Sequence, residues 1–326
     1  MIPVRLSSFR PFPWLILIAT AAFALVPWWT DNVTSRENLI LAALDITLAS
    51  NLNLMLGYAG YVNFGNIVMF GLGGYIGVYL VSVWHWPLLG ATLAGAIAVS
   101  IIAYLFGLGV LRLRGAYFAL ATIGVNEAVS VFVTNFEPWG GATGLYLSLG
   151  AYAPLGGPRR ALWIVYFLMV AVMGLSLALS YAIRHSKFGL GLMAIGENED
   201  AAATLGVPTR IYKAMVYSVS AFLPAIAGGL YFFKSGIIEP TGAFDLTTSI
   251  EAIVMVMLGG QGTVAGPAIG AFLYEELRGY LLTAQAFSHF QLVIAGLLLL
   301  VIVLFAPGGL MGFVHQKLPF TRRWLE

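Results

Sequence analysis

Cysteine is absent from this 326-residue chain, and charged residues are scarce. Without cysteine the chain has no disulfide, no thiolate metal site and no cysteine nucleophile. Only 9% of its residues are charged, against about 25% in soluble domains, whereas 60% are hydrophobic. The four histidines, at 85, 185, 289 and 315, stand singly and lack the spacing of a metal cluster. This composition predicts an all-α polytopic membrane protein, with residues 1–326 forming a single transmembrane domain.

Sequence signals of nucleic-acid binding and of catalysis are also missing. The net charge of +2 comes from scattered loop residues without a basic tract, so a nucleic-acid partner is not expected. No G-x-x-x-x-G-K-[ST] motif occurs, and GGQGTVAGP at 259–267 lacks the lysine of a phosphate cradle. No Ser/His/Asp set stands out. We therefore expect a chain that is not an enzyme and that binds no metal and no cofactor itself.

Eight apolar runs are long enough to cross a bilayer, because about 20 helical residues span about 30 Å. They cover residues 14–29, 38–57, 62–83, 90–111, 115–134, 161–183, 214–233 and 290–306. If the N-terminus is cytosolic, the outer loops hold Arg36, Arg159, Arg160, Lys234 and Arg278. The other eleven of the sixteen Lys and Arg residues then lie on the cytosolic side. This excess predicts cytosolic N- and C-termini.

The stretch 248–283 does not fit one simple helix. Its first apolar part supplies about ten helical residues, or about 15 Å, only half the hydrocarbon thickness. Glycines and Pro267 then interrupt the pattern and free backbone groups that lipid cannot satisfy, so this break must be buried in protein or line a cavity. The segment is expected to be a re-entrant hairpin or two tilted crossings, giving eight to ten spans in total. Broken helices of this kind commonly mark a translocation route.

A second glycine cluster, from Leu56 to Gly77, contains Asn63 and Asn66 at membrane depth. Gly73 and Gly77, four residues apart, would allow two helices to pack closely through small residues. The asparagines need polar partners, which either a packed interface or a wet path supplies. Both interpretations stay open, and both can hold together.

A charged loop at about 184–213 separates two apolar runs that contain no charge. Within it, Asn198 can cap a short helix whose first turn holds Glu199 and Asp200 and whose end is marked by Gly206 and Pro208. Two helical turns are marginal in water, so this helix should be ordered by docking onto the membrane domain or onto a partner protein. The alternative is a solvated connector.

Four segments together make the chain similar to a known family. They are NLMLGYAGYVNFGN (53–66), LRLRGAYFALATIGVNE (111–127), SKFGLGLMAIGENEDAAATLGVPTRIYK (186–213) and SIEAIVMVMLGGQGTVAGPAIGA (249–271). In this order they resemble the permeases of ATP-binding-cassette (ABC) importers for branched-chain amino acids, of the LivM type. The resemblance extends from about residue 38 to residue 306.

The resemblance implies a multi-pass permease in a bacterial or archaeal plasma or inner membrane. Its implied partners are membrane lipid, a second related permease that completes a heterodimer, an extracytoplasmic substrate-binding protein and two cytosolic ATPases, which hold the ATP and Mg. The loop helix would be the helix that couples to the ATPases, formed by Glu199, Asp200, Ala201, Ala202, Ala203, Thr204, Leu205 and Gly206. Candidate residues of the translocation path are Asn53, Asn63, Asn66, Glu127, Gly259, Gly260, Gln261 and Gly262.

The substrate is less sharply indicated. Where many relatives read GYAGQVSLGH, this chain has Tyr61, Asn63 and Asn66, near the expected path. Branched-chain or other apolar amino acids are the first expectation, and urea or short amides are the alternative within the family. A secondary carrier driven by an ion gradient would also use broken helices and buried carboxylates. It would have little need of a capped cytosolic helix, which favours the ABC interpretation.

Three carboxylates fall inside predicted spans, where ionisable groups are costly and functionally suspect. Asp45 and Glu251 lie near span ends and are expected to reach interfacial water. Glu127 lies near the middle of its run, so it is the better candidate for a buried structural partner or a path-lining group. A path carboxylate is one group that could bind the ammonium of an amino acid.

Overall fold

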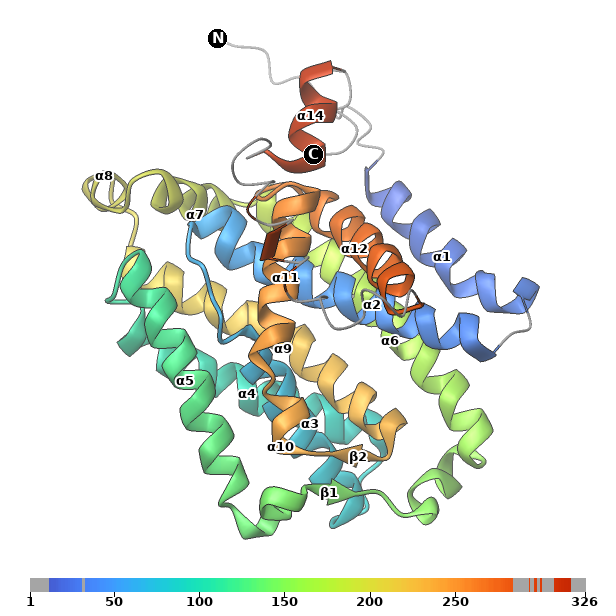
Figure 1. Ribbon diagram of the computed structural model, residues 1–326. Helices are drawn as coiled ribbons and strands as arrows, with labels where there is room; N and C mark the ends of the chain where they lie inside the picture. The colour runs from blue at the N-terminus through green and yellow to red at the C-terminus, as the bar shows by residue number, and fades with distance from the viewer. Residues whose placement is uncertain are drawn as a thin grey trace.

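The computed structural model describes residues 12–30, 33–283 and 308–317, together with four single positions between 293 and 300. Apart from those four positions, the predicted span 290–306 lies outside the described residues, as do both chain ends. Six helical stretches are long and apolar enough to cross a membrane, and two shorter apolar helices accompany them. The all-α polytopic class is thus confirmed for the described part of the chain (Figure 1).

The helices follow the predicted runs closely. They are α1 (Phe12–Thr30), α2 (Val33–Asn53), which continues as the π-helix η1 (Leu54–Tyr58), α3 (Asn66–Ser82), α4 (Leu88–Val110), α5 (Ala116–Thr134), α6 (Pro158–Arg184), α7 (Lys187–Glu197), α8 (Glu199–Thr204), α9 (Thr209–Ser235), α10 (Pro240–Ala243), α11 (Leu246–Gly259), α12 (Gly266–Thr283) and α14 (Gly309–Lys317). Short 3₁₀ turns fill the connection between α5 and α6. Two-residue strands β1 (Leu145–Tyr146) and β2 (Ile237–Ile238) pair antiparallel.

The core forms where α3 packs against α4 and α9. A Cβ atom added at Gly73 would overlap the backbone of Ala225 in α9, and one added at Gly228 would overlap the carbonyl of Phe70 in α3. Glycine lets these helix backbones touch, which matters in lipid because close packing replaces much of the hydrophobic driving force. The close-packing interpretation of the Gly73 region is therefore confirmed.

The molecule has two distinct ends. One end carries α7 and α8, and the chain turns there from α4 to α5 and from α6 to α7 (Figure 1). The opposite end carries the β1–β2 pair, and an ion pair there joins Lys234 in α9 to Glu37 in α2. We call these the α8 end and the β end.

The stretch 248–283 forms two helices, α11 and α12, separated at residues 260–265. The first helix is longer than the expected ten residues: α11 has 14, and the stretch Pro240–Gly259 is long enough to cross a membrane. The 14 residues of α11 alone extend about 21 Å, and the short helix α10 precedes them. The two helices meet at backbone contact, since a Cβ at Gly259 would overlap the carbonyl oxygen of Gly266.

Candidate functional site

The short helix α8 forms as the sequence predicts, one residue shorter at its end. The side-chain oxygen of Asn198 accepts hydrogen bonds from the backbone N–H groups of Asp200 (3.1 Å) and Ala201 (3.0 Å). Glu199 and Asp200 occupy the first turn, where carboxylates interact favourably with the helix dipole. Gly206, at φ +87°, reverses the chain direction after the helix.

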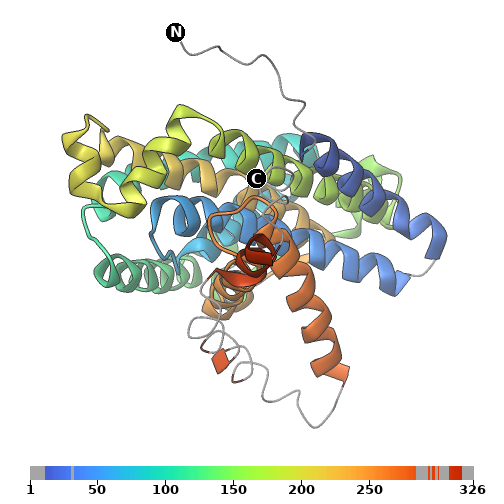
Figure 2. The ribbon, with the colours of Figure 1, turned by 90° about the horizontal axis from the view of Figure 1, so that it is seen from above.

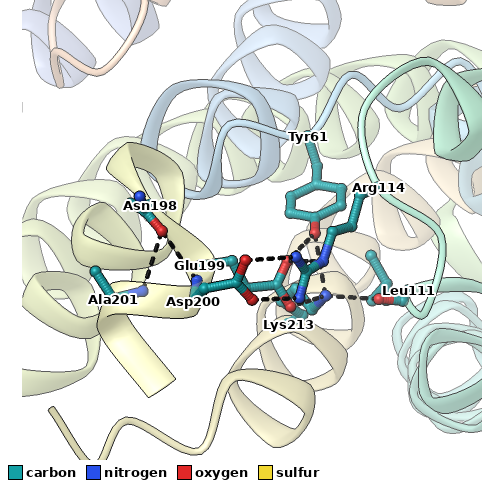
Figure 3. Close-up of polar contacts among 8 residues, drawn as sticks. All are labelled: Tyr61, Leu111, Arg114, Asn198, Glu199, Asp200, Ala201 and Lys213. Atoms are coloured by element: carbon teal, nitrogen blue, oxygen red, sulfur yellow. Dashed lines mark hydrogen bonds and ion pairs between the residues drawn. The ribbon is translucent and has the colours of Figure 1, made fainter. Parts of the chain in front are cut away.

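Glu199 docks α8 onto the membrane domain (Figure 3). Its two carboxylate oxygens accept hydrogen bonds from Lys213 Nζ (2.7 Å) and from the Tyr61 hydroxyl (2.6 Å). Lys213 Nζ also donates to the carbonyl of Leu111 (2.6 Å) and to the Tyr61 hydroxyl (3.0 Å). One buried ammonium therefore joins α8, α9, the end of α4 and the segment after η1. We call Tyr61, Glu199 and Lys213 the docking cluster.

Arg114 adds an outer layer to the docking cluster. Its guanidinium forms two hydrogen bonds with Asp200 (2.9 and 3.1 Å), and its Nε lies 3.3 Å from Glu199. The side chains of Arg114 and Asp200 are 56% and 78% exposed, so solvent weakens their attraction. The Lys213–Glu199 pair is better shielded from solvent, since the Lys213 side chain is only 3% exposed. It therefore contributes more than the Arg114–Asp200 pair to the attachment of α8 to the membrane domain.

The docking cluster favours the ionised form of Glu199. Partial burial opposes ionisation of this carboxyl, but the hydrogen bonds from Lys213 and Tyr61 outweigh it and lower the pKa of Glu199. The pKa of the Tyr61 hydroxyl is raised by burial and by its hydrogen bond to Glu199. The hydrogen bonds from Arg114 lower the pKa of Asp200. The cluster is therefore an ammonium and a carboxylate bridged by a neutral phenol.

Asn53 brings two predicted path motifs together. Its amide nitrogen donates to the carbonyl of Thr263 (2.9 Å), and its amide oxygen accepts from the backbone N–H of Gly262 (2.9 Å). Arg184, at the α8 end of α6, donates to the carbonyl of Gly262. These side chains satisfy backbone groups that the break between α11 and α12 would otherwise leave without partners. Asn53, at the start of the π-helix η1, thus holds the backbone between α11 and α12 in place.

The other predicted path residues have different surroundings. Asn63 is buried and its side-chain oxygen accepts from the backbone of Gly65 (2.9 Å), so it shapes the turn before α3. Asn66 begins α3 and is also buried. Gly260, at φ +121°, lies against α14, where an added Cβ would come 2.9 Å from Met311 Cβ. Gln261 is exposed. The structure therefore joins Asn53 and Gly262 and leaves the others apart.

Two of the three membrane carboxylates differ from the sequence-based expectation. Asp45 and Glu251 are buried, with relative exposures of 7% and 8%, so the prediction that they reach interfacial water is wrong. Glu251 and Glu275 lie 3.9 and 3.7 Å from the guanidinium of Arg278 in α12. Glu127, for which the sequence left open a buried structural partner or a path-lining group, is exposed on α5, so only the path-lining alternative stays open. Distance from a span end predicts depth, but it does not predict which side of a helix faces the neighbouring helices.

Comparison with known proteins places this architecture in a family. Residues 36–303 match the family model described as the permease component of the branched-chain amino acid transport system. This chain belongs to that family. The permease LivM of Escherichia coli K12 is 26% identical over 93% of this chain and 76% of the relative. LivH of the same strain is 24% identical over 86% of this chain and 94% of the relative.

A partial likeness extends to another transport system. The ribose import permease RbsC of Bacillus subtilis is 29% identical over 57% of this chain and 57% of that protein. No solved structure matches the chain. The chain is therefore a multi-pass membrane permease by family and by structure.

The two faces of α8 in this permease differ sharply. Ala202 is fully buried against its own chain, so it is not available to a partner protein. The outward face consists of Ala201, Ala203, Thr204 and Leu205, and Leu205 is 82% exposed. The sequence-based prediction assigned all residues from Glu199 to Gly206 to the coupling helix alike. A run of alanines does not reveal which side of a two-turn helix packs against the membrane domain.

Tyr61 has a role at this site that the sequence did not predict. Its departure from the common family pattern suggested a role near the substrate path, yet its hydroxyl reaches Glu199, 138 positions further along the chain. Lys213 is the last residue of the charged loop predicted at 184–213, yet its side chain is almost completely buried. No local spacing connects these residues. A signal was nevertheless present, because a lysine at the edge of an apolar run needs a carboxylate or carbonyl partner if it is buried.

Proposed function

We propose that this chain is one of two related permease subunits of an ATP-driven importer for branched-chain or other apolar amino acids. The observation that carries the proposal is α8, a capped helix held rigidly to the transmembrane domain with its outer face uncovered. A helix docked in this way can transmit movement from a cytosolic ATPase to α9 and to the α4–α5 connection, because the docking cluster joins all three.

The family relationship supports the set of partners. LivM and LivH are both named as permeases of a high-affinity branched-chain amino acid transport system, which suggests a pair of related subunits. The remaining partners in the proposal are two ATPases, which bind ATP and Mg, and an extracytoplasmic binding protein. This chain itself binds no cofactor and hydrolyses no ATP. Urea or short amides remain the alternative substrates within the family.

We infer further that the α8 end is cytosolic in a bacterial or archaeal inner membrane. More basic residues lie at the α8 end than at the β end, and the positive-inside rule places the richer end in the cytosol. Those at the α8 end are Arg112, Arg114, Arg184, Lys187, Arg210 and Lys213. Those toward the β end are Arg36, Arg159, Arg160 and Lys234, and Arg278 in α12 is assigned to the same outer side. The α11–α12 pair then enters from outside and reaches the level of Arg184, which supports two crossings and ten spans in total.

Reconstitution tests the proposed function. In proteoliposomes that contain both permeases and the ATPases, leucine uptake should require ATP and the binding protein and should persist after a protonophore collapses the proton gradient. A secondary carrier would behave differently, because it needs an intramembrane group that binds and releases an ion in each cycle. Uptake by this chain alone, driven by a pH gradient, would contradict the proposal.

A further inference from the structure

One face of α5 is exposed along its length. Tyr117, Leu120, Gly124, Glu127 and Val131 recur at alternating intervals of three and four residues, which places them on one side of the helix. All five are exposed, three of them by more than half. The helix lies at one edge of the molecule in both ribbon views (Figures 1 and 2). We call these five residues the α5 face.

Polar contacts on the opposite side fix the rotation of α5. The amide of Asn126 donates to the carbonyl of Phe244 (2.9 Å), and the Thr122 hydroxyl accepts from the backbone N–H of Phe64 (3.1 Å). Both anchoring side chains are buried. Because Asn126 and Thr122 are held inward, Glu127 is held outward. Within the described parts of the chain, the Glu127 carboxylate has no hydrogen-bond or ion-pair partner.

The depth of Glu127 in α5 argues against a lipid-facing surface. The 19 residues of α5 extend about 28 Å, close to the hydrocarbon thickness, and Glu127 is the twelfth of them. An ionisable side chain at this depth is costly in lipid and usually faces protein or water. The α4 helix shows the contrast: its exposed residues include Leu93, Ile97, Ile101 and Leu105 and no charged group. The outer face of α4 suits lipid, whereas the α5 face does not.

We propose that the α5 face lines a water-filled path opposite the second permease subunit, and that Glu127 binds the ammonium group of the amino acid in transit. The inference rests on the proposed function and adds the residue that recognises the substrate's charge. A carboxylate and an ammonium are complementary in charge and form a strong hydrogen bond. Gly124 leaves space beside it, since an added Cβ there would have no atom within 4 Å.

Cysteine accessibility tests the path, and the absence of native cysteine makes each variant a single-cysteine protein. In the reconstituted complex, Gly124→Cys and Val131→Cys should react with a small charged methanethiosulfonate reagent, and leucine with binding protein should slow the reaction. The matched control is Ile101→Cys on the exposed face of α4, which should stay unreactive. If the α5 cysteines are as inert as this control in every nucleotide state, the face meets lipid or a dry contact, and the inference is wrong.

Uptake by charge variants tests the ammonium site. At subsaturating leucine, Glu127→Gln should lower the uptake rate about tenfold, because a charge-assisted hydrogen bond is lost. Glu127→Asp keeps the charge and should recover most of the rate. Equal uptake by wild type and Glu127→Gln, or equal loss in both variants, would overturn the assignment. Absence of leucine uptake by the wild-type complex would instead count against the proposed substrate class, while inert α5 cysteines count against this inference alone.

Discussion

Lys213 shows how a single charged side chain is accommodated at the α8 end of the membrane domain. Burial of an ammonium is costly unless it is paired and hydrogen-bonded. Lys213 meets this requirement with three acceptors: the Glu199 carboxylate, the Leu111 carbonyl and the Tyr61 hydroxyl. An ammonium has three N–H donors, so the set is complete. Each acceptor belongs to a different segment, which makes one residue responsible for the orientation of α8.

Removal of the carboxylate should therefore loosen α8. In Glu199→Gln the buried ammonium loses its counter-charge, and loss of one partner of a buried pair costs about 3–5 kcal/mol. We expect the lower end of that range, because the other two acceptors of Lys213 remain. Hydrogen exchange of residues 187–210 in the purified complex measures the effect. Asp200→Asn, which alters only the exposed outer layer, is the control and should change exchange little.

The stability that the docking cluster contributes depends on pH, because the pKa of Glu199 is lowered. A carboxyl with a lower pKa in the folded state contributes stability above its ordinary pKa of 4.5 and loses that contribution as pH falls through the folded value. The difference in thermal stability between wild type and Glu199→Gln should hence be constant near neutral pH and shrink below about pH 4.5. A difference that grows on acidification would contradict the ionised docking cluster.

At the scale of elements, α8 forms because capping and docking act together. A two-turn helix is marginal in water, and its cap alone contributes about 1 kcal/mol. The docking cluster fixes one side of α8 and leaves the other free. The inner and outer faces can therefore be separated by mutation.

Substitutions on the two faces of α8 should have different effects. Leu205→Asp changes a side chain that is 82% exposed, so the chain should insert and fold normally but lose ATPase binding and uptake. Ala202→Arg places a large side chain at a fully buried position, so it should destabilise the packing of α8 against the rest of the permease. Co-purification of the ATPases, together with thermal stability of the permease pair, distinguishes them. Normal uptake by Leu205→Asp would exclude the outer face of α8 as the coupling surface.

The crossing of α11 and α12 is the second element whose geometry is specific. A Cβ at Gly259 would overlap the Gly266 carbonyl oxygen, and one at Gly270 would overlap the carbonyl of Met255. Gly259→Ala should therefore lower stability by about 1–3 kcal/mol, because backbone atoms cannot move aside cheaply. Gly109→Ala in α4 is the matched control, since an added Cβ there meets no atom within 4 Å. Equal thermal stability of the two variants would show that the helices do not cross in contact.

At the scale of the whole molecule, the two ends should lie on opposite sides of the membrane. Thr204 on α8 and Leu149 beside β1 are both exposed, and neither belongs to the docking cluster. In intact cells that express the permeases without the ATPases, Leu149→Cys should react with a membrane-impermeant thiol reagent, whereas Thr204→Cys should react only after permeabilisation. The absence of other cysteines in the chain removes background labelling from it. The reverse pattern would invert the proposed orientation.

Elements were more predictable than their contacts. Seven of the eight predicted spans, from 14–29 to 214–233, correspond to described helices, because apolar length is a local property of the sequence. Asn198 as a cap and Gly206 as a stop were also local and were confirmed. The burial of Asp45 and Glu251 and the exposure of Glu127 were not predictable in this way. The rotation of each helix about its axis depends on neighbours that are distant in the chain.

Composition and local pattern alone determined that this protein is a polytopic helical membrane protein, because an apolar run of about 20 residues crosses the bilayer as a helix whose backbone groups are satisfied internally. They also determined where α8 begins and, to within one residue, where it ends. Tertiary structure decided what α8 is attached to, since Tyr61 and Lys213 reach Glu199 from segments that no sequence period relates. It also decided that Asn53 holds the α11–α12 break and that Glu127 faces outward. Polar groups in a membrane protein must find partners, and only the packing of distant helices determines which partners are within reach.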